Sequence, residues 1–385
     1  MSVFYDEASL VLVPSGYKAS KVYAQKPLTT DGQLTFSRAS TATRVNASGL
    51  VETVASNVPR LDYLGSTCPK LQLEPQRQNL ALYSSAFNES SYWFANNATI
   101  TANNAVSPDG TSNADMYTAT GSSNFLNGAA VSAGSNTITY SVFVKAGTQS
   151  VFRIREAYYF GTATIFNLST GTVTSGTGTI TNYGNGWYRC THTQAYGAGE
   201  VNLSCIYDTT ASTGTFYIYG AQFEVGAYAT SYIPTTAAAV TRLADAASKT
   251  GISSLIGQTE GTLFMDFVAQ QTSTAQSHIW LDTDIAIFGG TTLTFYTSGG
   301  VEFNGGTLVT GQRYKVAFGY KLNDFVAYVN GVQVGTDTSG TVPATSNLYL
   351  NQYSGGIQIQ KKELNQALLF KTRLTNDQLA QLTAV

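Results

Sequence analysis

The chain has 385 residues, of which 43% are hydrophobic and only 11% charged, with a formal net charge of −2. This length has room for about two or three domains, and charge at less than half the usual frequency of about 25% leaves the surface to hydroxyls and amides. The 21 basic residues form no stripe, which excludes a nucleic-acid-binding protein, because phosphate contacts need Lys and Arg gathered on one face.

Residues 1–80 are expected to form an extended N-terminal region of short strands. Leu34–Phe36 and Leu50–Val54 read as strands, with the turn Asn46–Gly49 between them. Lys70–Leu73 alternates apolar and polar residues and is followed by Pro75, which has no N–H to donate to a sheet. The segment 36–45 shows no helical period.

Residues 81–240 are expected to form one antiparallel β-sandwich. Short segments rich in β-branched and aromatic residues recur between clusters of Gly, Asn and Ser, and this spacing is typical of a sandwich or barrel. The predicted strands are 114–117, 137–145, 150–154, 163–167, 187–194, 201–207 and 215–224.

Residues 241–259 form a predicted linker, with a short helix as one option over 244–256. Residues 260–385 are expected to form a second sandwich, in which Asn330-Gly331 predicts a type I′ hairpin. Thr375 and Gln378 predict a capping box for a C-terminal helix. The predicted strands are 261–268, 278–281, 285–288, 292–296, 314–320, 324–329 and 348–350.

Several blocks of this sequence resemble known families. The start of the chain resembles that of many phage virion and fibre proteins, in the blocks 36–46, 49–50, 59–63, 73–77 and 79–80, which follow in the same order. The middle of the chain resembles a carbohydrate-binding-module-like jelly roll, in the segments 141–147, 186–190 and 219–234. The last part resembles the concanavalin-A-like, laminin-G-like lectin sandwich, in the segment 325–332 and the ending 369–382.

The resemblance implies a fold and a role. The fold is all-β, with two antiparallel β-sandwich (jelly-roll) domains after an N-terminal attachment region. The role is that of a bacteriophage head or tail fibre or decoration protein, attached to other capsid or tail proteins and displaying lectin-like domains to host surface glycans. Such proteins are homo-oligomers, commonly trimers or dimers. Two alternatives stay open: a host-recognition lectin whose main task is glycan binding, and a glycan depolymerase.

Cellular location and redox state follow from simple patterns. Residues 1–5 lack the basic start and apolar core of a secretory signal, so we expect assembly in the host cytoplasm and residence in the virion. No apolar run approaches the roughly 20 residues that span a bilayer, so membrane insertion is not expected. Cys68, Cys190 and Cys205 have no zinc spacing; we expect reduced thiols, with a bridge between Cys190 and Cys205 as the alternative.

No catalytic constellation is visible, and we therefore expect no enzymatic activity and no catalytic residue. The only histidines, His192 and His278, lack the partner pattern of a nucleophile and its base. A glycosidase needs two carboxylates facing each other. Asp282 and Asp284 lie in a predicted turn, and Asp266 stands alone among apolar residues.

Two sets of candidate binding residues remain. Aromatic faces stack on sugar rings and amides bond sugar hydroxyls, so Tyr92, Trp93 and Asn96, with Tyr158 and Tyr159, are the candidate glycan-binding residues; the alternative is that these rings pack in the core. No cofactor is required by the sequence. A structural calcium ion, which prefers oxygen ligands, would use the carboxylates of Asp109, Asp115 and Glu224.

Overall fold

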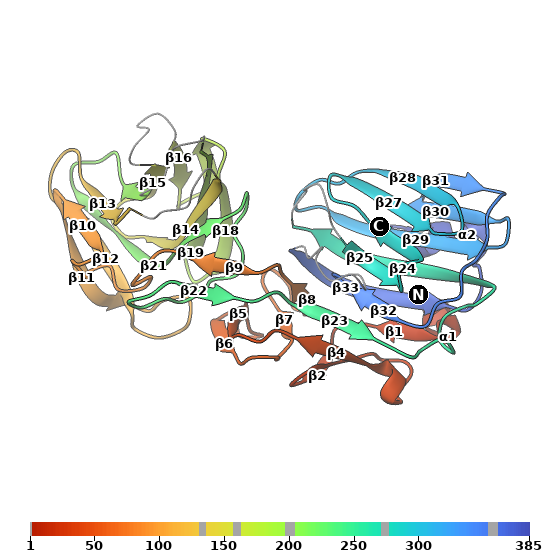
Figure 1. Cartoon of the computed structure of the whole chain (residues 1–385). Coiled ribbons are helices and arrows are strands. Elements are labelled where there is room, and N and C mark those ends of the chain that lie inside the picture. The colour runs from red at the N-terminus through yellow and green to blue at the C-terminus, as the bar shows by residue number, and fades with distance from the viewer. Residues whose placement is uncertain (1, 131–135, 157–162, 197–204, 271–276, 353–360) are drawn as a thin grey trace.

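The computed structural model describes residues 2–130, 136–156, 163–196, 205–270, 277–352 and 361–385. Two β-sandwiches lie next to each other, and strands run between them (Figure 1). Every strand pair in the described residues is antiparallel, and the short helices α1 (Ser2–Glu7) and α2 (Asn376–Thr383) and the 3-10 turn η1 (Thr30–Gly32) are additions to the sheets. The expected fold class of antiparallel β-sandwiches is confirmed.

The first sandwich consists of two six-stranded sheets in the described part of the chain. One has the order β10 (Trp93–Asn96), β13 (Phe125–Gly128), β20 (Cys205–Asp208), β15 (Val151–Glu156), β16 (Ala163–Asn167) and β17 (Thr172–Ser175). The other has the order β11 (Ala98–Ala105), β12 (Ala114–Ala119), β21 (Gly214–Val225), β14 (Thr137–Ala146), β19 (Trp187–Ala195) and β18 (Thr179–Gly184).

Strand alternation separates the core of this sandwich from its outer face. On β14, Ile138, Tyr140 and Val142 are fully buried in the core between the sheets. The residues between them, Thr139 and Ser141, point to the other side of the same sheet, because successive side chains of a strand alternate. The part of this outer face on β18 and β19 becomes one wall of the candidate site.

The second sandwich is larger. Among the described residues, its eight-stranded sheet has the order β31 (Val332–Asp337), β30 (Phe325–Val329), β29 (Arg313–Lys321), β24 (Glu260–Ala269), β33 (Lys362–Phe370), β8 (Lys70–Leu73) and β7 (Arg60–Asp62), with β1 (Leu10–Leu12) also on β33. Its nine-stranded sheet has the order β2 (Gly16–Lys18), β3 (Lys21–Tyr23), β4 (Gln33–Ser37), β23 (Ala246–Lys249), β32 (Leu348–Leu350), β25 (Ser277–Leu281), β26 (Ile285–Phe288), β27 (Thr292–Thr297) and β28 (Val301–Thr307).

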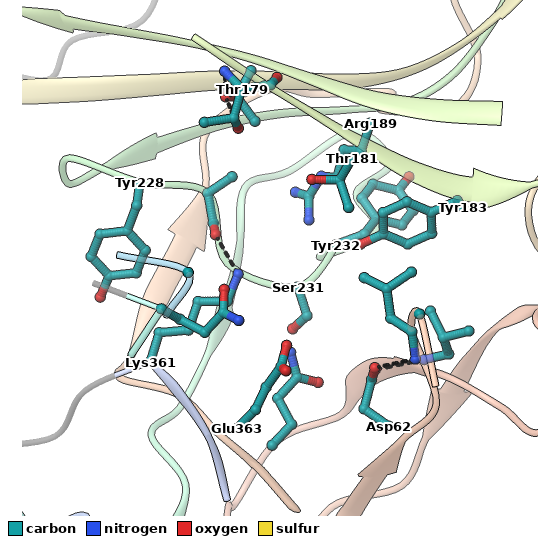
Figure 2. A pocket seen from close by; sticks show the side chains of 18 of the residues that line it. Asp62, Thr179, Thr181, Tyr183, Arg189, Tyr228, Ser231, Tyr232, Lys361 and Glu363 are labelled. Atoms are coloured by element: carbon teal, nitrogen blue, oxygen red, sulfur yellow. Dashed lines mark hydrogen bonds between the residues drawn. The ribbon is translucent and has the colours of Figure 1, made fainter. Parts of the chain in front are cut away.

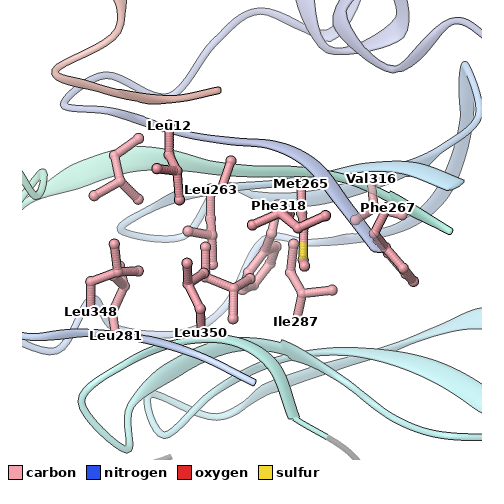
Figure 3. Close-up of a cluster of buried hydrophobic side chains, with 14 of the residues drawn as sticks. Leu12, Leu263, Met265, Phe267, Leu281, Ile287, Val316, Phe318, Leu348 and Leu350 are labelled. Carbon is pink, nitrogen blue, oxygen red and sulfur yellow. The ribbon is translucent and has the colours of Figure 1, made fainter. Parts of the chain in front are cut away.

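An apolar core fills the space between these two sheets (Figure 3). Leu263 and Met265 of β24 and Phe318 of β29 meet Leu281 of β25 and Ile287 of β26, and all five are fully buried. Alternate apolar positions on both sheets therefore interlock, as in other sandwiches whose sheets pack face to face.

Most strands of the N-terminal region join the sheets of the second sandwich. β1, β7 and β8 join one sheet and β2, β3 and β4 join the other. Leu12, Leu34 and Leu71 are fully buried in the shared core. Sequence patterning missed this arrangement because the partner of β1, for example Leu369 opposite Leu10, lies far along the chain.

The remaining strands connect the two sandwiches. β5 (Ala42–Val45) pairs with β6 (Val51–Val54), and β9 (Arg77–Asn79) pairs with β22 (Val240–Arg242). The linker option of a helix over 244–256 is wrong, because β23 is paired on both sides, by β4 and β32, and sheet pairing overrides the local helix propensity of alanine. The domain boundaries after residues 80, 240 and 259 stay a prediction.

The local signals were accurate. Every predicted strand overlaps a strand of the structure, with 201–204 outside the described residues. Asn330 and Gly331 both have positive φ, at 49° and 84°, and they join β30 to β31 as a type I′ turn requires. The capping box at Thr375 and Gln378 is present at the start of α2.

Candidate binding cleft

A cleft of about 860 Å³ lies where three parts of the chain meet (Figure 2). One wall is the outer face of β18 and β19, and the segment 227–232 runs along it. The other side comes from β5 to β8 together with residues 361–363. The volume falls within the roughly 300–1,000 Å³ of typical ligand pockets.

The β18–β19 wall presents hydroxyl groups. Thr179 lies opposite Thr191, and Thr181 lies opposite Arg189. The hydroxyls of Thr179 and Thr191 are 2.7 Å apart, and Thr179 and Thr181 are exposed. Because alternate residues share a face, Cys190 between them faces the core, and the wall carries polar groups at regular spacing.

Aromatic rings line the same cleft. Tyr228 is half-buried, the Arg77 guanidinium stands 5.1 Å from its ring centroid, and Arg77 Nη2 donates to the phenol oxygen at 3.0 Å. Tyr232 is buried and shares a 2.7 Å hydrogen bond with Ser84. Burial raises the pKa of Tyr232 to about 12 and raises that of Tyr228. Both phenols are therefore neutral at physiological pH.

Arg189 lies at the end of this wall and is only 4% exposed. Its Nη1 donates to the Thr230 carbonyl at 2.5 Å and its Nη2 donates to Ser141 Oγ at 2.9 Å. The guanidinium also stands 5.4 Å from the centroid of the Phe143 ring. These hydrogen-bond partners are uncharged, so they satisfy the geometry of the cation without neutralising it.

Two carboxylates line the opposite side. Asp62 accepts hydrogen bonds from the backbone N–H groups of Val45 and Leu64, at 2.8 and 2.9 Å. Burial raises the pKa of Asp62, and the nearby Glu363 raises it further against those two hydrogen bonds. Glu363 itself forms an ion pair of 2.6 Å with Lys70.

Behind the segment 227–232 lies a fully buried set of charges, called here the buried arginine cluster: Arg38, Arg60, Glu74, Arg242 and Asp245. Arg60 Nη1 lies 2.7 Å from Glu74, Arg38 Nη1 lies 3.0 Å from Asp245, and Arg60 Nη2 also pairs with Asp245. Burial alone would raise the pKa of the Glu74 carboxyl, but Arg242 and Arg60 lower it well below its usual value.

This cluster positions the cleft. Glu74 Oε1 accepts from the backbone N–H of Ser231 at 2.9 Å, and Glu74 Oε2 accepts from the Ser231 hydroxyl at 2.6 Å. Glu224 fixes the neighbouring residue, because its two oxygens accept from the N–H and the hydroxyl of Thr230, both at 2.7 Å. The segment 227–232 is thus held from both sandwiches.

Of the candidate glycan-binding residues, the structure describes Tyr92, Trp93 and Asn96. Tyr92 and Trp93 are buried in the core of the first sandwich, at 7% and 3% exposure, so their expected stacking role is wrong. Asn96 lies on β10 and donates to the Ser123 carbonyl at 3.0 Å. Tyr158 and Tyr159 lie outside the described residues. The exposed ring is that of Phe94, at 61% exposure.

The candidate calcium ligands lie apart, each engaged by donors of the chain. Asp109 accepts from Ser107, Thr111, Asn113 and Tyr219, and these bonds lower its pKa against the effect of burial. Asp115 accepts from the N–H groups of Phe87 and Asn103. Glu224 is occupied by Thr230 as above. Among the described residues, no group of three or more His, Cys, Asp or Glu gathers for a metal ion.

The residues considered for catalysis are engaged elsewhere. Asp266 accepts a bidentate pair of hydrogen bonds from Arg313. Asp282 accepts a hydrogen bond from the backbone N–H of Ser346, and Asp284 accepts one from the Ser298 hydroxyl. His192 and His278 are buried. Cys190 is a free buried thiol, so the alternative of a bridge to Cys205 is wrong.

Sequence reasoning missed the cleft, although part of its signal was visible. Thr177, Thr179 and Thr181 alternate before Arg189, and Thr191 and Thr193 alternate after it. This pattern marks a polar outer face on two adjacent strands. No local pattern showed that β5 to β8 and residues 361–363 would face that wall.

The chain matches no family model and no curated protein. Solved structures give partial likenesses. A sialidase of Trypanosoma rangeli in complex with the inhibitor DANA is 13% identical over 36% of this chain and 25% of that chain, at a TM-score of 0.30. Domain 4 of AbnA, a GH43 extracellular arabinanase of Geobacillus stearothermophilus, is 18% identical over 40% of this chain and 82% of the domain, at 0.30. The CBM40 domain of a Ruminococcus gnavus IT-sialidase is 12% identical over 34% and 84%, at 0.27.

The chain thus spans a quarter of the length of the sialidase that it matches. Likenesses of this size carry no argument about function. No helix in the described ranges is long and apolar enough to cross a membrane.

Proposed function

We propose that this protein is a non-enzymatic structural protein of a bacteriophage particle that binds surface glycans in the cleft between its sandwiches. The observation that carries the glycan-binding part is the lining of the cleft. Exposed threonines at alternate strand positions and the half-buried ring of Tyr228 line the same cleft. Hydroxyls and amides bond sugar hydroxyls, while ring faces cover the apolar face of a sugar.

The phage part of the proposal rests on the resemblance of the N-terminal blocks 36–46, 59–63 and 73–77 to virion proteins. In this proposal the chain is a head or tail fibre or decoration protein, joined to capsid or tail proteins and assembled as a trimer or dimer in the host cytoplasm. Antibody labelling of intact purified particles tests it. Labelled heads or tails support the role, and particles that lack the chain contradict it.

Glycan binding is tested with the full chain on a glycan array, followed by calorimetry with the best ligand. Tyr228→Ala is expected to raise Kd at least about tenfold, because truncation removes a ring from the cleft. Phe94→Ala is the matched control, since this exposed ring on β10 lies outside the cleft. Loss of binding in Phe94→Ala with full binding in Tyr228→Ala would move the site to β10, and no binding to any glycan would end the proposal.

A glycan depolymerase is the second candidate, favoured by one observation: Asp62, whose pKa is raised, and Glu363 both line the cleft. Against it, both Asp62 oxygens accept backbone N–H groups and Glu363 is paired with Lys70. Incubation with polysaccharide and an assay for new reducing ends decides. Release that is abolished in Asp62→Asn and in Glu363→Gln would establish the enzyme.

A further inference from the structure

We infer that the cleft selects glycans that carry an anionic group, a carboxylate in the first place, over neutral glycans. This inference rests on the proposed glycan binding and concerns the same site. It starts from the charges that line the cleft: Arg44, Lys70, Arg189 and Lys361 are basic, and Asp62 and Glu363 are acidic.

Two of these cations are already neutralised. Arg44 Nε lies 2.7 Å from Glu52 and Lys70 Nζ lies 2.6 Å from Glu363. Arg189 and Lys361 have no such carboxylate within 4 Å in the ranges that the structure describes. The cleft therefore keeps a local excess of positive charge in a chain whose net charge is −2.

Arg189 is the stronger part of the argument. Its Nε has no hydrogen-bond partner among the described residues, although the side chain is more than nine-tenths buried. Its other donors reach the Thr230 carbonyl, the Ser141 hydroxyl and the Tyr183 phenol, which are all uncharged. Buried charges in proteins are normally paired, because taking a lone ion out of water costs several kcal/mol. Arg189 lines the cleft, so an anion bound there would balance its charge.

Lys361 approaches the same space from another side. Its Nζ donates to the Ala229 carbonyl at 2.9 Å. The nearest buried acid behind it, Glu74, is saturated by Arg60, Arg242 and Ser231. Figure 2 shows the ends of the Lys361 and Arg189 side chains reaching toward the segment that carries Ser231.

An acidic sugar fits this arrangement. Its anionic group would lie between the Arg189 guanidinium and the Lys361 ammonium, where charge-assisted hydrogen bonds are shorter and stronger than neutral ones. Its ring hydroxyls would reach the hydroxyls of Thr179 and Thr181 on the adjoining wall. A neutral sugar can use the threonines only, and leaves the two cations unpaired.

The test measures Kd of the full chain for hyaluronate and polygalacturonate, which carry carboxylates, for dextran sulfate, and for neutral dextran. We expect the charged polymers to bind at least about tenfold tighter than dextran. The sulfate arm then identifies the anion: tighter binding of the two polyuronates supports the carboxylate, and tighter binding of dextran sulfate contradicts that part.

Variants locate the effect. Lys361→Gln is expected to remove most of the preference for charged polymers, while Lys371→Gln, the same change at an exposed lysine outside the cleft, leaves it intact. Arg189→Gln should act in the same direction; because Arg189 also holds Thr230, its result counts only when its thermal unfolding matches the wild type, and Lys361→Gln carries the test otherwise.

The two ways of failing are distinguishable. Equal affinity for dextran and the charged polymers, or a preference that Lys361→Gln leaves unchanged, overturns the anionic selection and leaves glycan binding standing. No binding to any glycan, charged or neutral, overturns the proposed function and this inference with it.

Discussion

His192 and His278 are buried, one in each sandwich. Burial lowers the pKa of His192 to about 4, and burial with the neighbouring Lys362 lowers that of His278 well below its usual value. The unfolded chain takes up these protons near pH 6.5, while the folded chain resists them. Stability from the neutral histidines is therefore present above about pH 6.5 and is lost as the pH falls, by up to about 1.4 kcal/mol per pH unit for each histidine.

We therefore predict that His192→Gln flattens the pH dependence of the free energy of unfolding between about pH 6 and 4.5. Urea unfolding followed by fluorescence in a Trp280→Phe background reports the first sandwich, because Trp93 and Trp187 both lie in it. His278→Gln is expected to act in the same direction, because the pKa of His278 is lowered too and the two sandwiches are joined by the buried charges. Parallel stability curves for His192→Gln and the wild type would contradict the prediction.

The aromatic run 92–94 shows what the sequence leaves open. Tyr92, Trp93 and Phe94 stand together as aromatic residues, and sequence alone cannot decide which of them faces out. A shift of one position exchanges the core side of a strand for its solvent side. In the structure Trp93 is buried and Phe94 is exposed. The sequence therefore predicts the aromatic run, but not which of its rings faces the solvent.

At the scale of elements, a bulge in β21 shapes the cleft wall. Ser141 pairs with Gln222 but Phe143 pairs with Tyr219, so β21 holds an extra residue at this point. Gly220 sits in the bulge with a φ of +64°, and a Cβ there would stand 2.9 Å from the Phe143 ring and 3.2 Å from the Tyr232 ring. Both rings line the cleft.

Gly220→Ala is therefore expected to destabilise the chain by about 2–4 kcal/mol, from backbone strain and overpacking together, and to weaken glycan binding. Gly331→Ala is the matched control. It has a similar φ of +84° but nothing closer than 3.8 Å, so only strain of about 1–2 kcal/mol is expected, with binding unchanged. Urea unfolding and calorimetry measure both effects. Equal losses in the two variants would refute the packing argument.

The strands themselves could be predicted, because alternation, hairpin residues and the helix cap are local features. Asn330-Gly331 and Thr375 to Gln378 are examples that need no distant partner. Pairing is different. β8 pairs with β33 through Leu71 and Leu364. The periodicity of either segment does not predict its partner, because the two are separated by about three-quarters of the chain and the contact depends on closing that long loop.

At the scale of the whole molecule, the N-terminal blocks that resemble virion proteins have a structural use. Arg38, Arg60 and Glu74 come from these blocks and form the buried arginine cluster with Arg242 and Asp245. Their side chains join the second sandwich to the segment 227–232 that leaves the first. In the proposed function, attachment of residues 1–80 to a virion protein would therefore use other, exposed side chains of this region.

The buried arginine cluster ties the two sandwiches into one unit. Asp245 accepts from Arg38 Nη1 at 3.0 Å, from Arg60 Nη2 and from the Glu74 backbone N–H at 2.8 Å. Asp245→Asn leaves three buried arginines with Glu74 as the remaining acid of the cluster. Removing one partner of a buried ion pair typically costs about 3–5 kcal/mol, since the other charge stays buried without compensation.

We expect Asp245→Asn to lose stability by this amount, with little relief from added salt, and to unfold in two separated urea transitions because the sandwiches lose their link. Glu52→Gln breaks the partly exposed pair with Arg44 and should cost under about 1 kcal/mol, as surface pairs do. Trp280 fluorescence reports the second sandwich and Trp93 with Trp187 the first. A loss in Asp245→Asn no larger than that in Glu52→Gln would mean that packing at β9 and β22, and not the buried charges, holds the two sandwiches together.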